Sequence, residues 1–305
     1  MRDTRIYKNL LQEIWDEQRF VCVGLDPDIG KIPDAITRNR TDVYDILMTF
    51  LKLIVDATYD YAAAYKANSA FFEKFGVDGI KALIEIVRYI QNGPAMDLPV
   101  ILDAKRADIG NTNIGYASFA FDIVRADAIT VHPYLGAEAL KPFLNSNKGV
   151  FVLCRTSNPG AGEFQDLLVD GEPLYQVVAR RVAKEWSWNG TGNCGVVVGA
   201  TYPDELRSVR KIVGETPILI PGIGAQGGDL EATIDAGLNV RGDGILINSS
   251  RGIIHASSGN DFAEAARREA EKLHNAINAR RHKLFKVRGR EVSLDDPKLA
   301  ERLGR

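Results

Sequence analysis

The sequence predicts a single α/β domain over residues 1–305, folded as a (β/α)8 TIM barrel. Short runs rich in β-branched residues alternate with longer stretches of helical pattern from end to end, and eight such pairs are present. Strands that are each followed by a helix form a parallel sheet, and eight units of this size match a closed barrel. An open, doubly wound sheet is the alternative, but no Gly-x-Gly-x-x-Gly motif follows the first strand.

The expected elements follow from this alternation. The predicted strands are Phe20–Leu25, Ala62–Lys66, Val100–Asp103, Ala128–His132, Val150–Leu153, Gly195–Val198, Ile218–Ile220 and Gly244–Ile247. The predicted helices include Tyr44–Tyr59, Gly79–Gln91, Gly115–Arg125, Leu174–Glu185, Asp204–Val213, Leu230–Ala236 and a last helix from Asp261 to about Arg281. The barrel core therefore spans about residues 20–281. Residues 282–305 are basic and then acidic, which predicts a surface tail, and the insertion at Pro27–Asp42 has no assigned role.

Composition limits the classes of partner and compartment. A net charge of -2 and a pI near 6.1 give no reason to expect nucleic acid or an anionic membrane as partner. Residues 1–18 carry charges throughout, unlike a signal peptide, and no run approaches the roughly 20 apolar residues of a membrane span. The cysteines Cys22, Cys154 and Cys194 lie in strand-like runs. An odd, sparse set of this kind predicts buried thiols in a reducing cytoplasm.

The most informative segment is Asp103-Ala-Lys-Arg-Ala-Asp-Ile-Gly-Asn-Thr112, which follows the apolar run 98–102. Side chains two apart on a strand point to the same side, so Asp103 and Lys105 should project together. Asp108 lies in the loop that follows. Two acids around one lysine keep that lysine protonated, which suits the delivery of a proton to a carbanion. A surface ion pair is the alternative, and it weakens because polar residues recur at other strand ends.

The carboxyl ends of the strands build the active site of a barrel, so their polar residues are the candidates for chemistry. Lys66 closes an apolar strand and needs a partner, whereas Asp26 has an ordinary turn aspartate as its alternative. Ser157 lacks the Gly-x-Ser-x-Gly surroundings of a nucleophile. His132 has no second His or Cys at metal-ligand spacing, so no metal site is predicted. The strand-end set is Asp26, Lys66, Asp103, Lys105, Asp108, His132, Ser157, Gln226, Ser250 and Arg251.

Two loops are typical of a phosphate site. Ile220–Asp229, after the seventh strand, is dense in glycine, and Asn248–Gly252 follows the eighth. Barrels often bind phosphate with these loops, because glycine lets backbone N–H groups approach the oxygens. Arg251 adds a guanidinium that can make two hydrogen bonds to a phosphate. The residues thus predict a barrel enzyme for a small phosphorylated substrate, with a lysine proton donor and without metal or redox cofactor. They do not name the reaction.

The assembled motifs resemble the orotidine 5′-phosphate decarboxylase family, in its longer-chain, type 2 branch. Residues 103–112 are similar to that family's Asp-x-Lys-x-x-Asp signature, with Ala107 where the branch usually has glycine. This small-for-small change is harmless provided that the backbone at Ala107 does not need a positive φ. The resemblance runs from about Phe20 to Ile253. It includes Gly24-Leu-Asp26, Lys66, Thr156–Ala161, Pro221–Asp229 and Arg251.

The resemblance implies a carboxy-lyase of pyrimidine biosynthesis that converts orotidine 5′-monophosphate to UMP and CO2 without a cofactor. In this family Lys105 would protonate C6 of the pyrimidine. The implied roles are a charged array of Lys66, Asp103, Lys105 and Asp108, and ribose contacts from Asp26 and Lys66. Ser157 would contact the base, Gln226 would bridge base and phosphate, and Arg251 would bind the phosphate. Ser250 is a further substrate-binding residue. Asp108, Ile109 and Thr112 would reach the neighbouring subunit's site, which implies a homodimer with shared active sites.

Two alternative functions are compatible with the sequence. Mg²⁺-dependent sugar-phosphate decarboxylases and aldolases of the same superfamily share the Asp-x-Lys-x-x-Asp strand, but they carry an acidic residue on the second strand, where this chain has Lys66. A non-catalytic nucleotide-binding barrel is the other, and it would gain nothing from an intact charged array.

Overall fold

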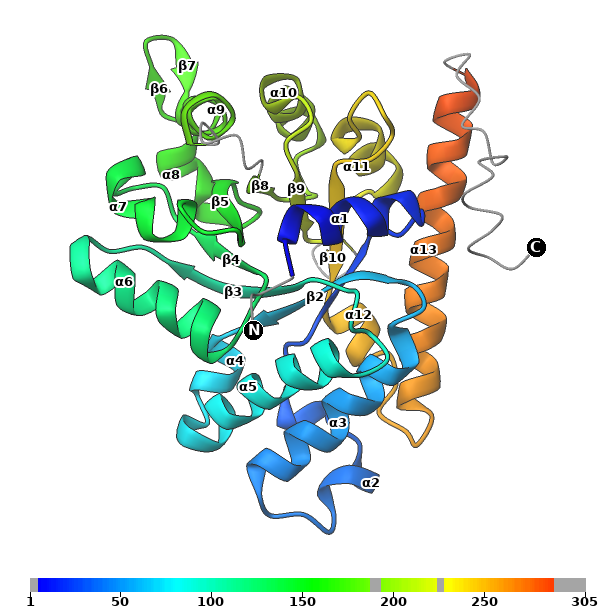
Figure 1. Ribbon diagram of the computed structural model, residues 1–305. Helices are drawn as coiled ribbons and strands as arrows, with labels where there is room; N and C mark the ends of the chain where they lie inside the picture. The colour runs from blue at the N-terminus through cyan, green and yellow to red at the C-terminus, as the bar shows by residue number, and fades with distance from the viewer. Residues whose placement is uncertain (1–4, 187–192, 224–227, 288–305) are drawn as a thin grey trace.

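The computed structural model of the protein describes residues 5–186, 193–223 and 228–287. Eight parallel strands close into a barrel in the order β1-β10-β9-β8-β5-β4-β3-β2, surrounded by helices (Figure 1). The strands are β1 Val21–Gly24, β2 Ala62–Asn68, β3 Val100–Arg106, β4 Ala128–Val131, β5 Gly149–Arg155, β8 Cys194–Val198, β9 Ile218–Pro221 and β10 Ile245–Ser249. Each overlaps a predicted strand, so the predicted fold class is confirmed.

The helices pack outside the strands and bury one apolar face each against them. The longer ones are α3 Val43–Thr58, α5 Gly76–Asn92, α6 Gly110–Ser118, α7 Gly136–Leu144, α9 Leu174–Arg181, α10 Pro203–Val213, α11 Leu230–Gly237 and α13 Phe262–Val287. Short helices are α2 Asp34–Thr37, α4 Ala70–Glu73, α8 Gly162–Gln165 and α12 Arg251–Ile254. The insertion at 27–42 thus holds α2 and a 3₁₀ turn at Ile29–Lys31.

An N-terminal helix, α1 Tyr7–Asp16, was not predicted. Its buried residues are Tyr7, Leu11, Ile14 and Trp15, which follow the three- and four-residue spacing of a helix face. Charged residues between them make this apolar pattern hard to recognise in the sequence. The Trp15 indole Nε1 donates a hydrogen bond of 3.0 Å to the carbonyl of Ile245, the first residue of β10. The helix therefore covers the end of the barrel where the strands begin, away from the predicted active site.

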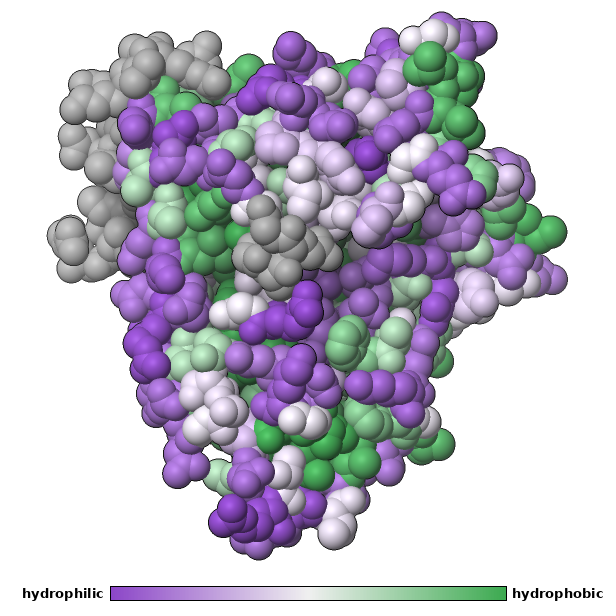
Figure 2. Space-filling model, turned by 180° about the vertical axis from the view of Figure 1, so that it is seen from behind, coloured by the Kyte–Doolittle hydropathy of each residue, from purple (hydrophilic) through white to green (hydrophobic). Residues whose placement is uncertain are grey.

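A two-stranded hairpin, β6 Leu168–Val169 and β7 Glu172–Pro173, follows β5 and was also not predicted. Its turn places Asp170 and Gly171 at positive φ, the conformation that tight turns require. The hairpin projects from the body at the upper left of Figure 1. Its exposed apolar side chains correspond to a green group at the upper right of Figure 2.

The predicted tail boundary at residue 282 needs a correction. Helix α13 continues to Val287 instead of ending near Arg281, and the Phe285 ring is buried. The Phe285 ring occupies the space that a side chain on Gly242 would need, and Gly242 has a φ of +85. The backbone at Gly242 can therefore pass directly beside the ring. Burial of an aromatic ring holds the last turns of the helix on the barrel. The rest of the predicted tail, residues 288–305, lies outside the described residues.

The three cysteines are buried, as predicted, and none of them forms a disulfide among the described residues. Burial raises the pKa of Cys22 and of Cys154 to about 12, so both side chains are neutral thiols at physiological pH. Within the described ranges, no helix is long and apolar enough to cross a membrane.

Candidate active site

A cavity of about 230 Å³ lies where the barrel strands end. Its walls come from the ends of β1, β2, β3, β9 and β10 and from the short helices α4 and α12. The lining residues are Asp26, Lys66, Asn68, Phe71, Asp103, Pro221, Gly222, Ile223, Asn248, Ser250 and Arg251. Five predicted site residues, Asp26, Lys66, Asp103, Ser250 and Arg251, are therefore brought together at the expected end of the barrel.

Two lysines hold one carboxylate at the centre of the site. Lys66 Nζ lies 3.1 Å from Asp103 Oδ2, and Lys105 Nζ lies 2.7 Å from Asp103 Oδ1. Strands β2 and β3 are neighbours in register, with Asn68 opposite Asp103. The partner that the buried Lys66 needs is thus supplied across the sheet.

The charges of this pair are mutually stabilised. Burial alone would lower the pKa of Lys66, but the carboxylates of Asp103 and Asp26 raise it above its usual value. Burial alone would raise the pKa of Asp103, but the ammonium groups of Lys66 and Lys105 hold it well below its usual range. The ionised Asp103 therefore stabilises the folded state at pH values above its unfolded pKa of about 3.9, and this contribution is lost as the pH falls further. The protonated Lys66 stabilises the folded state below its unfolded pKa of about 10.4, and this contribution is lost as the pH rises further.

Lys105 reaches Asp103 from an irregular backbone instead of a regular strand. Its φ is +47, in the left-handed region, and the pairing of β3 with β4 shifts in register between Leu102 and Arg106. The side chain is 48% exposed, so its ammonium group is open to a ligand. The predicted meeting of Asp103 and Lys105 is confirmed, although simple strand alternation does not produce it. Ala107 is not at positive φ, so the missing glycine is harmless as expected.

The ends of β1 and β10 also meet closely at the cavity. A Cβ on Gly24 would stand 1.8 Å from the Ser250 hydroxyl oxygen, so only glycine fits there. Asp26 follows on the loop after β1 and accepts a hydrogen bond of 3.2 Å from the Asn68 amide. Arg251, the first residue of α12, is exposed at the rim.

Two polar lining residues and one further polar contact were not among the predicted site residues. Asn68 lies two residues after Lys66 on β2, so strand alternation gave a signal for it. Asn248 donates a hydrogen bond of 2.9 Å to the Cys22 carbonyl and lies directly before the predicted serine pair. Thr130, inside β4, donates to Asp103 Oδ1 at 2.8 Å, and nothing in its apolar run marks it.

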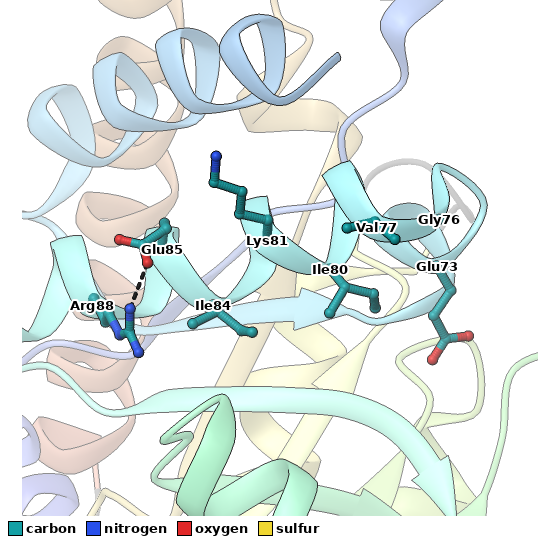
Figure 3. Close-up of a pocket in the computed structure, with 8 residues that line it drawn as sticks. All are labelled: Glu73, Gly76, Val77, Ile80, Lys81, Ile84, Glu85 and Arg88. Atoms are coloured by element: carbon teal, nitrogen blue, oxygen red, sulfur yellow. Dashed lines mark hydrogen bonds and ion pairs between the residues drawn. The ribbon is translucent and has the colours of Figure 1, made fainter. Parts of the chain in front are cut away.

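A larger hollow of about 610 Å³ lies on the outer surface of α5 (Figure 3). It shares no lining residue with the cavity at the strand ends. Among the described residues, no group of three or more His, Cys, Asp or Glu side chains is arranged to hold a metal ion.

Comparison with known proteins decides the family. The model of the orotidine 5′-phosphate decarboxylase / HUMPS family matches residues 19–268. The chain belongs to this family. A relative from Azoarcus sp., named orotidine 5′-phosphate decarboxylase, is 48% identical over 278 residues, covering 90% of this chain and 99% of its own. A relative of the same name from Cupriavidus metallidurans is 49% identical over 265 residues, covering 86% of this chain and 94% of its own.

The family fold is also found among solved structures. The structure of Leishmania donovani OMP decarboxylase superposes with a TM-score of 0.78 at 41% identity, covering 91% of this chain and 99% of that one. These similarities extend over 86–91% of this chain and 94–99% of the other proteins.

Among the described residues, the other predicted site residues, Lys105, Asp108, Ile109, Thr112 and Ser157, are not part of the cavity lining. Ser157, after β5, packs against Gly199, where a Cβ would stand 2.6 Å from the Ser157 Cβ. Gln226 lies outside the described residues. Asp108 makes no ion pair within the part of the chain that the structure describes, and its Oδ1 accepts the Ile109 amide hydrogen at 2.7 Å. Thr112 lines a separate surface hollow.

Proposed function

We propose that this protein converts orotidine 5′-monophosphate to UMP and CO2 without a cofactor, as a carboxy-lyase of pyrimidine biosynthesis. The observation that carries this proposal is the array of Lys66, Asp103 and Lys105 at the mouth of the barrel, in a chain 48% identical to proteins named for that reaction. A non-catalytic nucleotide-binding barrel would not require this array.

The chemical step begins when the bond between C6 and the substrate carboxylate breaks. The electron pair stays on C6, CO2 leaves, and Lys105 donates a proton from Nζ to C6. No ring position delocalises this carbanion well, so its stabilisation is largely electrostatic, from a fixed ammonium group close to the developing charge. Asp103, ionised beside Lys105, would also face the substrate carboxylate and raise the energy of the bound substrate.

The other residues bind the substrate. Asp26 and Lys66 line the cavity and would hydrogen-bond the ribose hydroxyls. Ser157 would contact the pyrimidine, and Gln226 would bridge base and phosphate. Ser250 and Arg251 also line the cavity and would hold the phosphate, whose binding energy would help to order the site.

Replacing Arg251 with alanine should reduce kcat/KM for the nucleotide by about 100-fold or more, because a charge-assisted contact to phosphate is lost. Activity toward orotidine, which has no phosphate, should barely change. Both rates follow from the loss of substrate absorbance. Arg207→Ala, on the outer helix α10, is the matched control and should leave both rates unchanged. Equal proportional losses on both substrates would mean that Arg251 does not act through the phosphate.

Treatment with EDTA separates the proposed reaction from that of the Mg²⁺-dependent members of the superfamily. Lys66 forms an ion pair where those enzymes carry an acidic residue. We therefore expect the decarboxylation rate to stay within twofold after dialysis against EDTA. A loss of activity that added Mg²⁺ restores would favour the sugar-phosphate enzymes instead.

The proposed active unit is a homodimer with shared active sites. Ile109, directly before α6, is 63% exposed, and Ile114, on α6, is 58% exposed. Val77, at the start of α5, is 84% exposed. Val77, Ile80 and Ile84 line the hollow along α5, together with charged side chains of the same helix (Figure 3). An exposed apolar surface beside the loop of Asp108 fits a second copy of the chain. Asp108 would then reach the partner's array, consistent with its lack of an ion pair among the described residues.

The proposed compartment is the cytoplasm, where buried cysteines outside a disulfide stay reduced. The near-neutral net charge of -2 supports a small-molecule substrate in preference to nucleic acid or membrane.

A further inference from the structure

Thr130 lies in the barrel interior on β4, and its side chain is buried beneath the charged array. Its hydroxyl oxygen accepts a hydrogen bond of 3.0 Å from the Lys105 amide and donates one of 2.8 Å to Asp103 Oδ1. The direction of both bonds is fixed, because an amide N–H only donates and a carboxylate only accepts. One hydroxyl thus joins the backbone of one charged residue to the side chain of the other.

The backbone of Lys105 needs this contact because the sheet is irregular there. Leu102 pairs with Ile129 and Arg106 pairs with Val131, so the pairing register shifts across the segment that holds Lys105. A left-handed conformation is unfavourable for a residue with a Cβ and persists only where its surroundings determine it. At Lys105, with φ +47, the Thr130 hydroxyl supplies the acceptor for its amide.

The same hydroxyl orients the carboxylate. Asp103 Oδ1 accepts from both Lys105 Nζ and Thr130, and Oδ2 accepts from Lys66. Hydrogen-bond donors on β2, β3 and β4 therefore hold the carboxylate in one orientation. Without the Thr130 hydroxyl, the carboxylate keeps both ammonium partners but loses the contact that ties it to β4.

We propose that Thr130 is a positioning residue, whose hydroxyl locks the left-handed backbone of Lys105 and the carboxylate of Asp103 into a single geometry that presents Lys105 Nζ to the reacting carbon. Thr130 is not among the residues that line the cavity, so it acts through its two partners. This inference rests on the proton-donor role proposed for Lys105.

The test compares two substitutions that differ in the hydroxyl. Thr130→Val keeps the side-chain shape but removes the hydroxyl, and Thr130→Ser keeps the hydroxyl. We expect the valine variant to lose about 10- to 100-fold in kcat, because small misplacements of a reacting group have effects of this size. Its KM and the Kd for UMP should stay within threefold, since the cavity wall is unchanged. The serine variant should retain kcat within about threefold.

Three results would overturn the proposal: an unchanged kcat in the valine variant, equal losses of kcat in the two variants, or a loss that appears in KM and UMP binding instead of kcat. Thermal unfolding of each variant verifies the fold. If the valine variant does not fold, Thr130→Ala compared with Thr130→Ser makes the same test. The variant Lys105→Ala distinguishes a failure of the Thr130 proposal from a failure of the proposed role of Lys105. If that variant is inactive while Thr130→Val keeps full activity, only the role of Thr130 fails; if Lys105→Ala is active, both roles fail.

Discussion

Replacing Lys105 with alanine should lower kcat by about 1000-fold or more, equivalent to about 4 kcal/mol of transition-state stabilisation. The substitution removes both the proton donor and the ammonium group nearest to the developing charge on C6. Among the described lysines, Lys66 is the one that lines the cavity, and its ammonium group is held in the ion pair with Asp103.

The fold should survive this substitution. The Lys105 side chain is half exposed, and Asp103 keeps its contacts with Lys66 and Thr130. The measurement is the loss of orotidine 5′-monophosphate absorbance with purified, metal-free protein, alongside thermal unfolding. Lys272→Ala, on the exposed face of α13, is the matched control and should keep full activity. A Lys105→Ala rate within tenfold of the unsubstituted protein, about 1.4 kcal/mol, would contradict the mechanism.

Mixing two inactive variants should restore activity if the subunits share their sites. Lys105→Ala and Asp108→Ala homodimers should each be inactive, because every site lacks one of the two groups. In a mixed dimer one site carries both lesions and the other carries neither. Random pairing makes half of the dimers mixed, and each has one good site of two, so co-refolding should recover up to about a quarter of the normal activity.

Subunit exchange must be verified independently, for example with two differently tagged chains isolated as a mixed dimer. Refolding each variant alone is the control and should recover nothing. If verified mixed dimers stay as inactive as the separate variants, Asp108 works within its own chain, and the proposed sharing of sites is wrong.

The local pattern of the sequence determined most of the fold. All eight barrel strands were predicted within a few residues, because buried parallel strands are continuous apolar runs that need no distant information to be recognised. The predictions that failed were for helices whose boundaries depend on tertiary contacts. Helix α1 was missed because charges mask its apolar face, and α13 was ended too early because Phe285 becomes a core residue only when it meets Gly242.

The sequence by itself also determined which residues stand at the strand ends: Asp26, Lys66, Asp103 and Arg251 all follow from the strand assignments and line one cavity. Only the tertiary structure decided how they interact. Lys66 and Asp103 are 37 positions apart and meet because β2 and β3 are neighbours in the barrel. The left-handed backbone at Lys105 depends on a hydroxyl from β4, 25 positions away. Strand patterns are local and can be read along the chain, whereas ion pairs and backbone strain depend on which strands the closed barrel places side by side.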